Sequence, residues 1–181
     1  MNRIVVFFIL CMAPALFSAQ ALSAQVGVAG EGRVGVTLPT GDLSGEGAEA
    51  GLALGAELQL NFQRNLTAYV GLNRHSFSCD RDCDLGPNPR STGLNAGLKY
   101  LFPSPPDALI WGRGGIVANQ LSDDRSSTSR NIGFELGAGI DMPIRPQLYL
   151  VPNLGFVSHS AGSGFTASYF TFGVGLHYHF N

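Results

Sequence analysis

The most regular feature of the sequence is an alternation of apolar residues with small or polar ones, which recurs in eight segments. The last segment shows it most plainly: every second residue from Phe170 to Phe180 is apolar, and the residues between them are Thr, Gly or His. Successive side chains of a β-strand point to opposite faces of the sheet, so this period predicts strands. The eight segments are residues 26–37, 51–62, 66–77, 92–102, 109–119, 131–144, 148–159 and 170–181. Pro152 cannot donate a ladder hydrogen bond and predicts a β-bulge in the seventh segment.

The connections between these segments alternate in length. Residues 63–65, 103–107 and 145–146 form short connections, and residues 38–49, 78–91, 120–130 and 160–167 form longer ones. Short turns on one side and long loops on the other are typical of bacterial outer-membrane barrels, in which the short turns face the periplasm. Because the number of predicted strands is even, we expect both termini in the periplasm and the long loops outside the cell.

Three features favour a membrane-spanning barrel over a soluble lipocalin-like barrel, which would also have eight strands. The polar positions carry few charges, and they are rich in glycine, which makes room inside a narrow barrel. The apolar positions near the short turns carry the aromatic residues that gather at membrane interfaces. These aromatic residues are Phe62, Tyr100, Phe102, Tyr178 and Phe180. Since lipid cannot satisfy an open sheet edge, we expect an all-β fold, an eight-stranded antiparallel transmembrane up-and-down β-barrel with its apolar face toward lipid.

The composition agrees with one such domain. The chain has 181 residues, of which 45% are hydrophobic, 24 are glycine and only 13% are charged. It is too apolar for a disordered chain and too poor in Lys and Glu for an ordinary soluble surface. The net charge of −2 leaves no basic surface for a nucleic acid.

The first 24 residues have the features of a signal peptide. Arg3 supplies a positive charge, an apolar run follows it, and small residues precede two possible cleavage positions, after Ala21 and after Ala24. The apolar run is shorter than the roughly 20 residues that span a bilayer. We expect cleavage after Ala24, with Ala21 as the alternative, which leaves residues 25–181 as the outer-membrane β-barrel domain.

The signal peptide, the eight strands and the ending Tyr178-x-Phe180 resemble small bacterial outer-membrane barrels related to the OmpA transmembrane domain, OmpX and the opacity proteins. The stretch GVTLPTGDLSGEG is similar to the first strand and loop of that superfamily. The resemblance covers Gln25 to Asn181 and implies an architecture, not an activity. It also implies that Tyr178 and Phe180 form the signal read by the barrel assembly machinery. The family usually ends on the aromatic residue itself, whereas here Asn181 follows it.

Seven charged residues occupy polar positions that would face the barrel interior. They are Glu31, Arg33, Glu57, Lys99, Arg113, Glu135 and Asp141. The interior of an eight-stranded barrel is just wide enough for side chains to fill, and charges buried there must be paired. We therefore expect a structural ion-pair network that plugs the lumen. A narrow gated pore is the alternative.

Histidine and serine residues near the strand ends raise two chemical alternatives. His177 and His179 lie two apart on one strand face, a spacing that suits metal binding, but no third ligand is fixed by spacing.

Lipid A deacylases are also eight-stranded barrels with a His and a Ser on late strands, so a lipid A-modifying esterase or deacylase is the alternative enzyme. Here His159 and Ser160 are adjacent and would point to opposite faces. We expect no catalytic residue, metal or other cofactor.

The connection at residues 78–91 contains Cys79 and Cys83, whereas the third cysteine, Cys11, lies in the signal peptide. Export through the oxidising periplasm favours a disulfide between Cys79 and Cys83. The acidic residues around them are Asp80, Asp82 and Asp84. Their spacing resembles part of a calcium loop, but the glycine and glutamate of such a loop are not in place, so we expect a solvated acidic loop.

The sequence therefore predicts a non-enzymatic outer-membrane β-barrel protein with a side-chain-filled lumen. Its expected role is structural, in the cell envelope, with surface loops for adhesion or ligand contact, because binding residues gather on loops held by a rigid scaffold. The expected partners are outer-membrane lipid, lipopolysaccharide and the barrel assembly machinery, and no nucleic acid. We expect a monomer.

Overall fold

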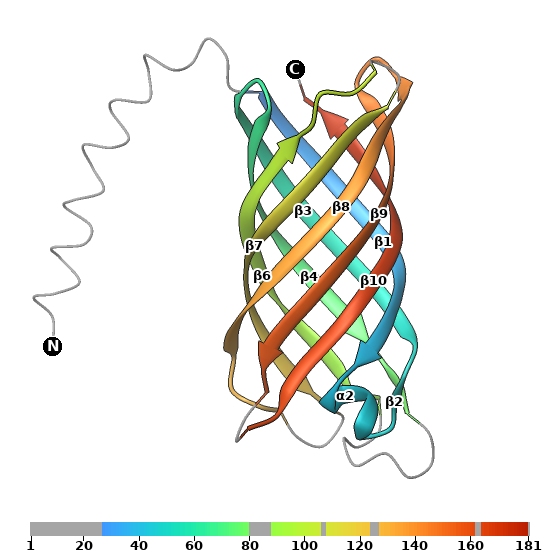
Figure 1. The fold of residues 1–181 in the computed structure, drawn as a ribbon, viewed down its shortest axis with the longest axis vertical. Coiled ribbons are helices and arrows are strands. Elements are labelled where there is room, and N and C mark those ends of the chain that lie inside the picture. The colour runs from blue at the N-terminus through green and yellow to red at the C-terminus, as the bar shows by residue number, and fades with distance from the viewer. Residues whose placement is uncertain (1–26, 80–87, 106–107, 124–126, 162–163, 181) are drawn as a thin grey trace, which may run out of the picture.

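Eight long strands close into one antiparallel barrel. The structure, a computed structural model, describes residues 27–79, 88–105, 108–123, 127–161 and 164–180. Each long strand pairs with the long strands before and after it, and the first pairs with the last (Figure 1). The strands are β1 (Gly27–Thr40), β3 (Gly51–Gln63), β4 (Leu66–Ser76), β6 (Arg90–Leu101), β7 (Leu109–Ser122), β8 (Asn131–Arg145), β9 (Leu148–Ser160) and β10 (Thr166–His179). The predicted fold class is confirmed.

The pairing of β1 with β10 closes the barrel. Its register runs from Ala29 opposite His179 to Thr40 opposite Ser168. With a partner on both sides of every long strand, the backbone leaves no open edge, as a hydrocarbon environment requires. The strands extend further toward the loops than predicted, to Thr40 in β1 and to Ser122 in β7. These strand ends contain Thr, Ser and Gln. The alternation of apolar and polar residues therefore stops before the hydrogen-bonded pairing of the strands ends.

The bulge expected at Pro152 is absent, and that prediction is wrong. The register between β8 and β9 is the same on both sides of the proline, with Gly139 opposite Asn153 and Met142 opposite Leu150. The missing N–H is accommodated by leaving the ladder open between these two pairs, so no extra residue is inserted. The described ladders shift register beside two short turns instead, at Asn61/Gln63 and at Pro143/Arg145.

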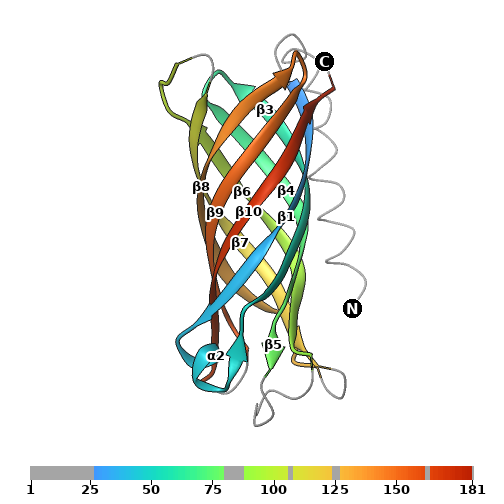
Figure 2. The ribbon, with the colours of Figure 1, turned by 90° about the vertical axis from the view of Figure 1, so that its right-hand side faces the viewer.

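The long loops carry structure that the alternation did not predict. Residues 38–49 were expected to be a loop, but they include α2 (Asp42–Gly45) and β2 (Ala48–Glu49), and β2 pairs with β5 (Ser78–Cys79) (Figure 2). A hydrophobic cluster fills the loop end of the barrel. Its buried members are Leu43, Ala48, Phe77, Val117, Leu121, Val157, Ala161, Ala167 and Tyr169. None of the described residues lies in a helix long and apolar enough to cross a membrane.

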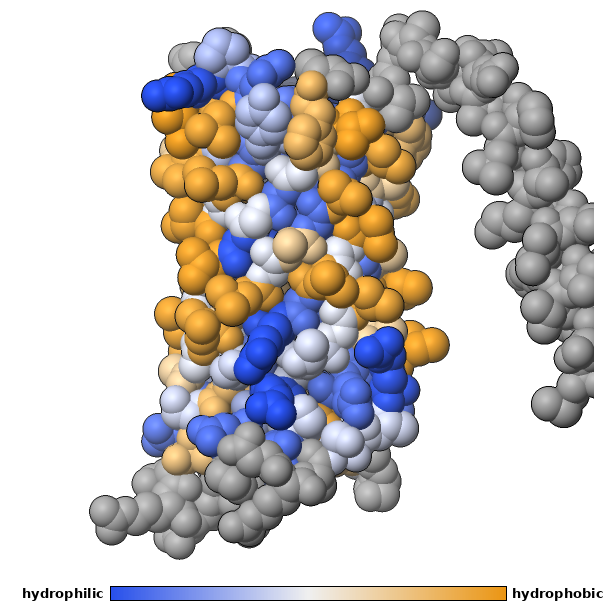
Figure 3. All heavy atoms as spheres, turned by 180° about the vertical axis from the view of Figure 1, so that it is seen from behind, coloured by the Kyte–Doolittle hydropathy of each residue, from blue (hydrophilic) through white to orange (hydrophobic). Residues whose placement is uncertain are grey.

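The barrel turns its apolar face outward and its polar face inward, as predicted. Leu58 is 56% exposed, whereas its neighbour Glu57 is 6% exposed, and apolar residues form a broad band around the wall (Figure 3). Glycine makes room on the inner face. A Cβ atom at Gly139 would lie 2.4 Å from Cζ2 of Trp111, so only glycine leaves space for this indole in the lumen.

Candidate functional site in the barrel lumen

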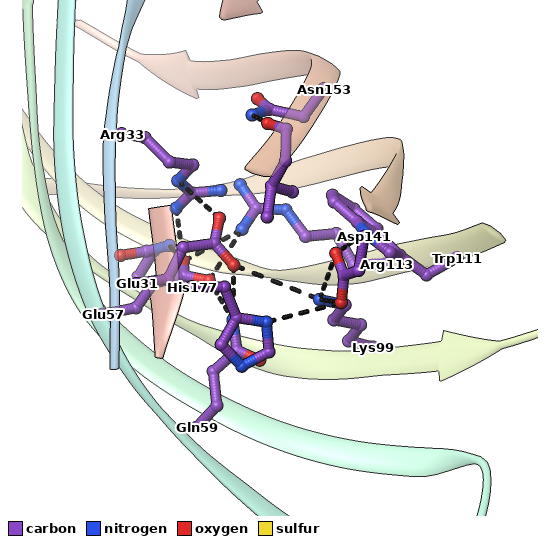
Figure 4. A network of polar contacts seen from close by, with 12 residues as sticks. Glu31, Arg33, Glu57, Gln59, Lys99, Trp111, Arg113, Asp141, Asn153 and His177 are labelled. Atoms are coloured by element: carbon purple, nitrogen blue, oxygen red, sulfur yellow. Dashed lines mark hydrogen bonds and ion pairs between the residues drawn. The ribbon is translucent and has the colours of Figure 1, made fainter. Parts of the chain in front are cut away.

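The centre of the lumen is a carboxylate held by two guanidinium groups. Glu57 points inward from β3, and Arg113 of β7 donates from Nη1 to its Oε2 at 2.9 Å and to its Oε1 at 3.2 Å (Figure 4). Arg33 of β1 donates from Nη2 to the same Oε2. Around the barrel, β3 and β7 are separated by two strands on one side and by four on the other. The pair between Arg113 and Glu57 therefore crosses the lumen.

Two further acids extend this centre. Glu31 Oε1 lies 3.6 Å from Arg33 Nε, and Glu135 Oε2 lies 3.6 Å from Arg113 Nη2. Asn95 donates from Nδ2 to Glu135 Oε1 at 3.0 Å. Each arginine therefore has a second acid beside it, and no arginine depends on Glu57 alone.

The network continues toward the short turns through a lysine and an aspartate. Lys99 Nζ lies 3.0 Å from Asp141 Oδ2, and Trp111 Nε1 donates to Asp141 Oδ1 at 2.6 Å. Gln59 donates from Nε2 to Glu31 Oε2 at 2.8 Å. Lys99 Nζ is also 4.0 Å from Glu31 Oε2, so this glutamate joins the two halves of the network.

The structure brings all seven charged residues predicted for the lumen into this one network. Three uncharged members, Gln59, Asn95 and Trp111, were not anticipated, although they occupy the same alternating positions as the charged ones. The acids and the lysine are buried, and the side chains of Arg33 and Arg113 are only 12% and 10% exposed. Charges so far removed from water are tolerated only when they are partnered.

A second polar cluster lies nearer the loops, around the fully buried Ser91. Its Oγ is 3.0 Å from His159 Nε2, and it accepts hydrogen bonds from Asn119 Nδ2 at 3.1 Å and from the Tyr169 hydroxyl at 3.3 Å. His159 Nδ1 is 3.0 Å from the carbonyl oxygen of Ser160, to which it donates. The Nε2 atom therefore accepts from Ser91. The imidazole faces Ser91 within the lumen, and the exposed Ser160 contributes only its backbone.

Two hollows flank the central network. A cavity of about 640 Å³ at the short-turn end is lined by Lys99, His177 and His179, among others. A smaller cavity of about 40 Å³ toward the loops is lined by Asn73 and His75. The rings of His177 and His179 are 4.6 Å apart between centroids. In the part of the chain that the structure describes, no three His, Cys, Asp or Glu side chains are grouped to hold a metal ion.

The terminal aromatic residues lie on the outer wall at the short-turn end. Tyr178 and Phe180 are 43% and 53% exposed, and their ring centroids are 5.5 Å apart. The Phe180 amide donates to the Val28 carbonyl at 3.0 Å, and the Tyr178 hydroxyl donates to Gln147 Oε1 at 3.1 Å. Their role as the assembly signal stays a prediction.

Several predicted features lie outside the described residues. These are the segment 1–24, Cys83, the acidic residues Asp80, Asp82 and Asp84, and the terminal Asn181. Cys79 is described, as the last residue of β5. The disulfide between Cys79 and Cys83 therefore stays a prediction.

That disulfide would close a very short ring and remove little conformational entropy from the unfolded chain. We therefore expect the double variant Cys79→Ser/Cys83→Ser to fold and to keep its heat-modifiable migration on a gel. Thiol labelling of denatured, unreduced protein from the cell envelope checks the bridge itself, and we expect no labelling. Labelling at both cysteines, or a double variant that forms no barrel, would contradict this account.

The comparison with known sequences decides the family. Residues 8–180 match the family model described as "Outer membrane protein beta-barrel domain". The chain belongs to this family. It is a small β-barrel protein of the bacterial outer membrane. No curated protein shows significant similarity to the sequence.

Solved structures of small outer-membrane barrels share the fold of this family member. Neisserial surface protein A is similar with a TM-score of 0.66 and 12% identity, over 84% of this chain and 96% of that chain. The protein OprG from Pseudomonas aeruginosa is similar with a TM-score of 0.56 and 11% identity, over 87% of this chain and 97% of that chain. The N-terminal barrel domain of OprF from the same organism is similar with a TM-score of 0.54 and 12% identity, over 85% of this chain and 99% of that chain. At these identities the similarity concerns the fold alone.

Proposed function

We propose that this family member is a non-enzymatic envelope protein whose own side chains fill its lumen, and that it presents its long loops for adhesion or ligand contact. The observation that carries the proposal is the pair of arginines, Arg33 and Arg113, on the buried Glu57 carboxylate in mid-lumen. By analogy with the family architecture, the short turns and both termini face the periplasm and the loops face outward.

Two groups of side chains, at different levels of the barrel, support the proposal of a filled lumen. The ion-pair network occupies the centre, and the hydrophobic cluster around Leu43 and Tyr169 occupies the loop end. Eight strands enclose an interior that side chains fill. Opening the centre would separate Arg113 from Glu57 in a site of low dielectric, which is strongly unfavourable. The closed lumen is therefore the stable state.

A role for the loops is supported by how firmly the long loop between β1 and β3 is tied to the barrel. The Thr166 amide at the start of β10 donates to Asp42 Oδ2 in this loop at 3.0 Å. Leu43 of the short helix α2, in the same loop, is fully buried. A rigid base of this kind holds a contact surface in place while the loop sequences vary.

A narrow gated pore is the second candidate, and the cavity of about 640 Å³ at the short-turn end favours it, because this hollow reaches as far as Lys99 and Asp141. Conduction would require the network beyond it to rearrange. Current recordings separate the two candidates.

The proposal is tested by recording from the refolded barrel in planar bilayers. We expect currents near the baseline, and a raised conductance in the double variant Glu57→Ser/Arg113→Ser, which removes the pair that crosses the lumen. Large steady currents from the unchanged protein would contradict the filled lumen. A lipid A mass spectrum of cells expressing the protein tests the alternative of a lipid A-modifying enzyme. We expect no change in the acyl chains, and a lost chain would contradict the proposal.

A further inference from the structure

The cavity of about 640 Å³ at the short-turn end of the lumen has a cationic lining. Arg64, in the exposed turn between β3 and β4, and the buried Lys99 contribute two positive charges. Asp141 is the one acid among the described residues that line the cavity. A cleft with walls of low dielectric concentrates the field of such an excess, so this cavity attracts anions.

The acids near this cavity are already occupied within the central network. Both carboxylate oxygens of Asp141 accept hydrogen bonds there, at 3.0 Å and 2.6 Å. Glu31 and Glu57 do not line the cavity. Gln59 does line it, and its Nε2 donates to Glu31 Oε2 at 2.8 Å and to Glu57 Oε1 at 3.1 Å. The amide of Gln59 therefore separates the cavity from these two carboxylates.

One buried side chain at the inner end of the cavity has an unused polar atom. His177 lines the cavity and is only 3% exposed. Its Nδ1 lies 3.4 Å from Asp141 Oδ2 (Figure 4), whereas its Nε2 has no hydrogen-bond partner among the residues that the structure describes. A buried polar atom without a partner is costly. In its protonated form the ring donates from both nitrogens, so that Nδ1 serves Asp141 and Nε2 serves a ligand oxygen.

Further donors line the cavity closer to the turn between β3 and β4. Asn61 Oδ1 accepts a hydrogen bond from Thr67 Oγ1 at 2.5 Å, which leaves the Nδ2 group of the same amide as a donor. Beyond it, the exposed Arg64 carries a planar guanidinium group, which matches the geometry of a carboxylate or a phosphate. The cavity therefore offers donors both at its buried end and at its exposed end.

We propose that this cavity binds a small organic anion with at least two carboxylate or phosphate groups. One acidic group accepts from His177 at the buried end, and a second pairs with Arg64 at the exposed end, with Asn61 donating beside them. The volume falls in the range of about 300–1,000 Å³ that is typical of ligand sites, so a molecule larger than a single inorganic ion fits. The ligand reaches the cavity from the periplasm, which rests on the orientation proposed above.

Equilibrium dialysis of radiolabelled citrate against the refolded barrel in a zwitterionic detergent tests the site, at constant ionic strength and about pH 6, where an ordinary histidine is largely protonated. We expect saturable binding that inorganic pyrophosphate displaces and that neutral sorbitol or cationic putrescine does not. The ratio of the affinities for citrate and pyrophosphate identifies carboxylate or phosphate as the preferred group.

Two pairs of variants assign the binding to this cavity. Arg64→Gln should weaken citrate binding by about fivefold or more, and His177→Phe by about tenfold or more, because each removes a charge-assisted contact. Arg145→Gln, exposed at the short-turn end of β8 and outside the cavity, is the control for the first variant. His75→Phe, in the small cavity beyond the network, is the control for the second. Both controls should bind as the unchanged protein does.

The site is overturned if the unchanged barrel shows no saturable binding of citrate or pyrophosphate, or if sorbitol competes as well as pyrophosphate does. Equal binding by Arg64→Gln and Arg145→Gln would also overturn it. Heat-modifiable migration verifies that each variant is folded before it is scored, and Arg64→Gln lies in an exposed turn. Dialysis depends on neither conductance nor orientation, so failure of this site is distinguishable from failure of the filled lumen.

Discussion

Replacing Glu57 by glutamine should lower the free energy of unfolding by about 3–5 kcal/mol if the lumen centre is dry. The substitution keeps the shape of the side chain but leaves Arg33 and Arg113 facing a neutral amide, with only the more distant carboxylates of Glu31 and Glu135 beside them. Removing one partner of a buried ion pair costs more than the pair contributes, because the remaining charge stays desolvated. Urea unfolding in lipid vesicles measures the change, and the chain has a single Trp, at position 111 beside the network, as its fluorescent reporter.

The matched control for Glu57→Gln is Glu49→Gln, because Glu49 lies exposed in the short strand β2. A surface change of this kind should shift the free energy of unfolding by no more than about 0.5 kcal/mol. A double variant, Glu57→Gln/Arg113→Met, should lose clearly less than the sum of its single changes, since the two side chains contact each other. Strict additivity, or equal losses for Glu57→Gln and Glu49→Gln, would show that the pair is not a buried interaction.

The second large effect concerns the lipid-facing wall. Leu58→Arg and Leu136→Arg should each destabilise the inserted barrel by about 2–4 kcal/mol, because each places a charge against hydrocarbon near the bilayer midplane. The two leucines are 56% and 54% exposed on the outer face. The folded fraction on a gel and urea unfolding in vesicles measure the loss.

Gln59→Arg is the matched control for the wall, since it makes a similar change one residue along the strand. Gln59 faces inward and donates to Glu31 and Glu57, so an arginine there meets two carboxylates. The cavity at the short-turn end also gives it room. Its effect should be much milder than that of Leu58→Arg. Equal damage from the two substitutions would mean that the assignment of the inner and outer faces is wrong.

The barrel could be predicted from the sequence because one physical rule applies along its whole length. Lipid demands apolar side chains on one face, and a narrow lumen admits only small or paired polar ones on the other, so strand parity alone separates Leu58 from Glu57. The same parity placed the charged residues of the lumen on the inner face. It could also have indicated Trp111 and Asn95, which occupy inner positions. An indole is not an obvious partner for a carboxylate, however, until the register places Asp141 diagonally across from Trp111, within hydrogen-bonding distance.

The loop end and the individual contacts could not be predicted in this way. The helix α2 covers only four residues, too few for a helical period, and Leu43 is buried by strands that are distant in the sequence. The partner of each charge depends on the register across the lumen, which alternation does not specify. The effect of Pro152 was misjudged because a ladder can stay in register while one hydrogen bond is missing.

The central claim is that the network closes the lumen, and cysteine accessibility on its two sides tests it most directly. In a background of Cys79→Ser/Cys83→Ser, Thr67→Cys places a thiol in the cavity at the short-turn end, and Asn73→Cys places one in the small cavity beyond the network. A charged, membrane-impermeant thiol reagent should modify the cysteine at position 67 rapidly and the one at position 73 far more slowly. Adding Glu57→Ser/Arg113→Ser should remove most of this difference. Equally fast modification at both positions in the barrel with an intact network would contradict the claim that the lumen is closed.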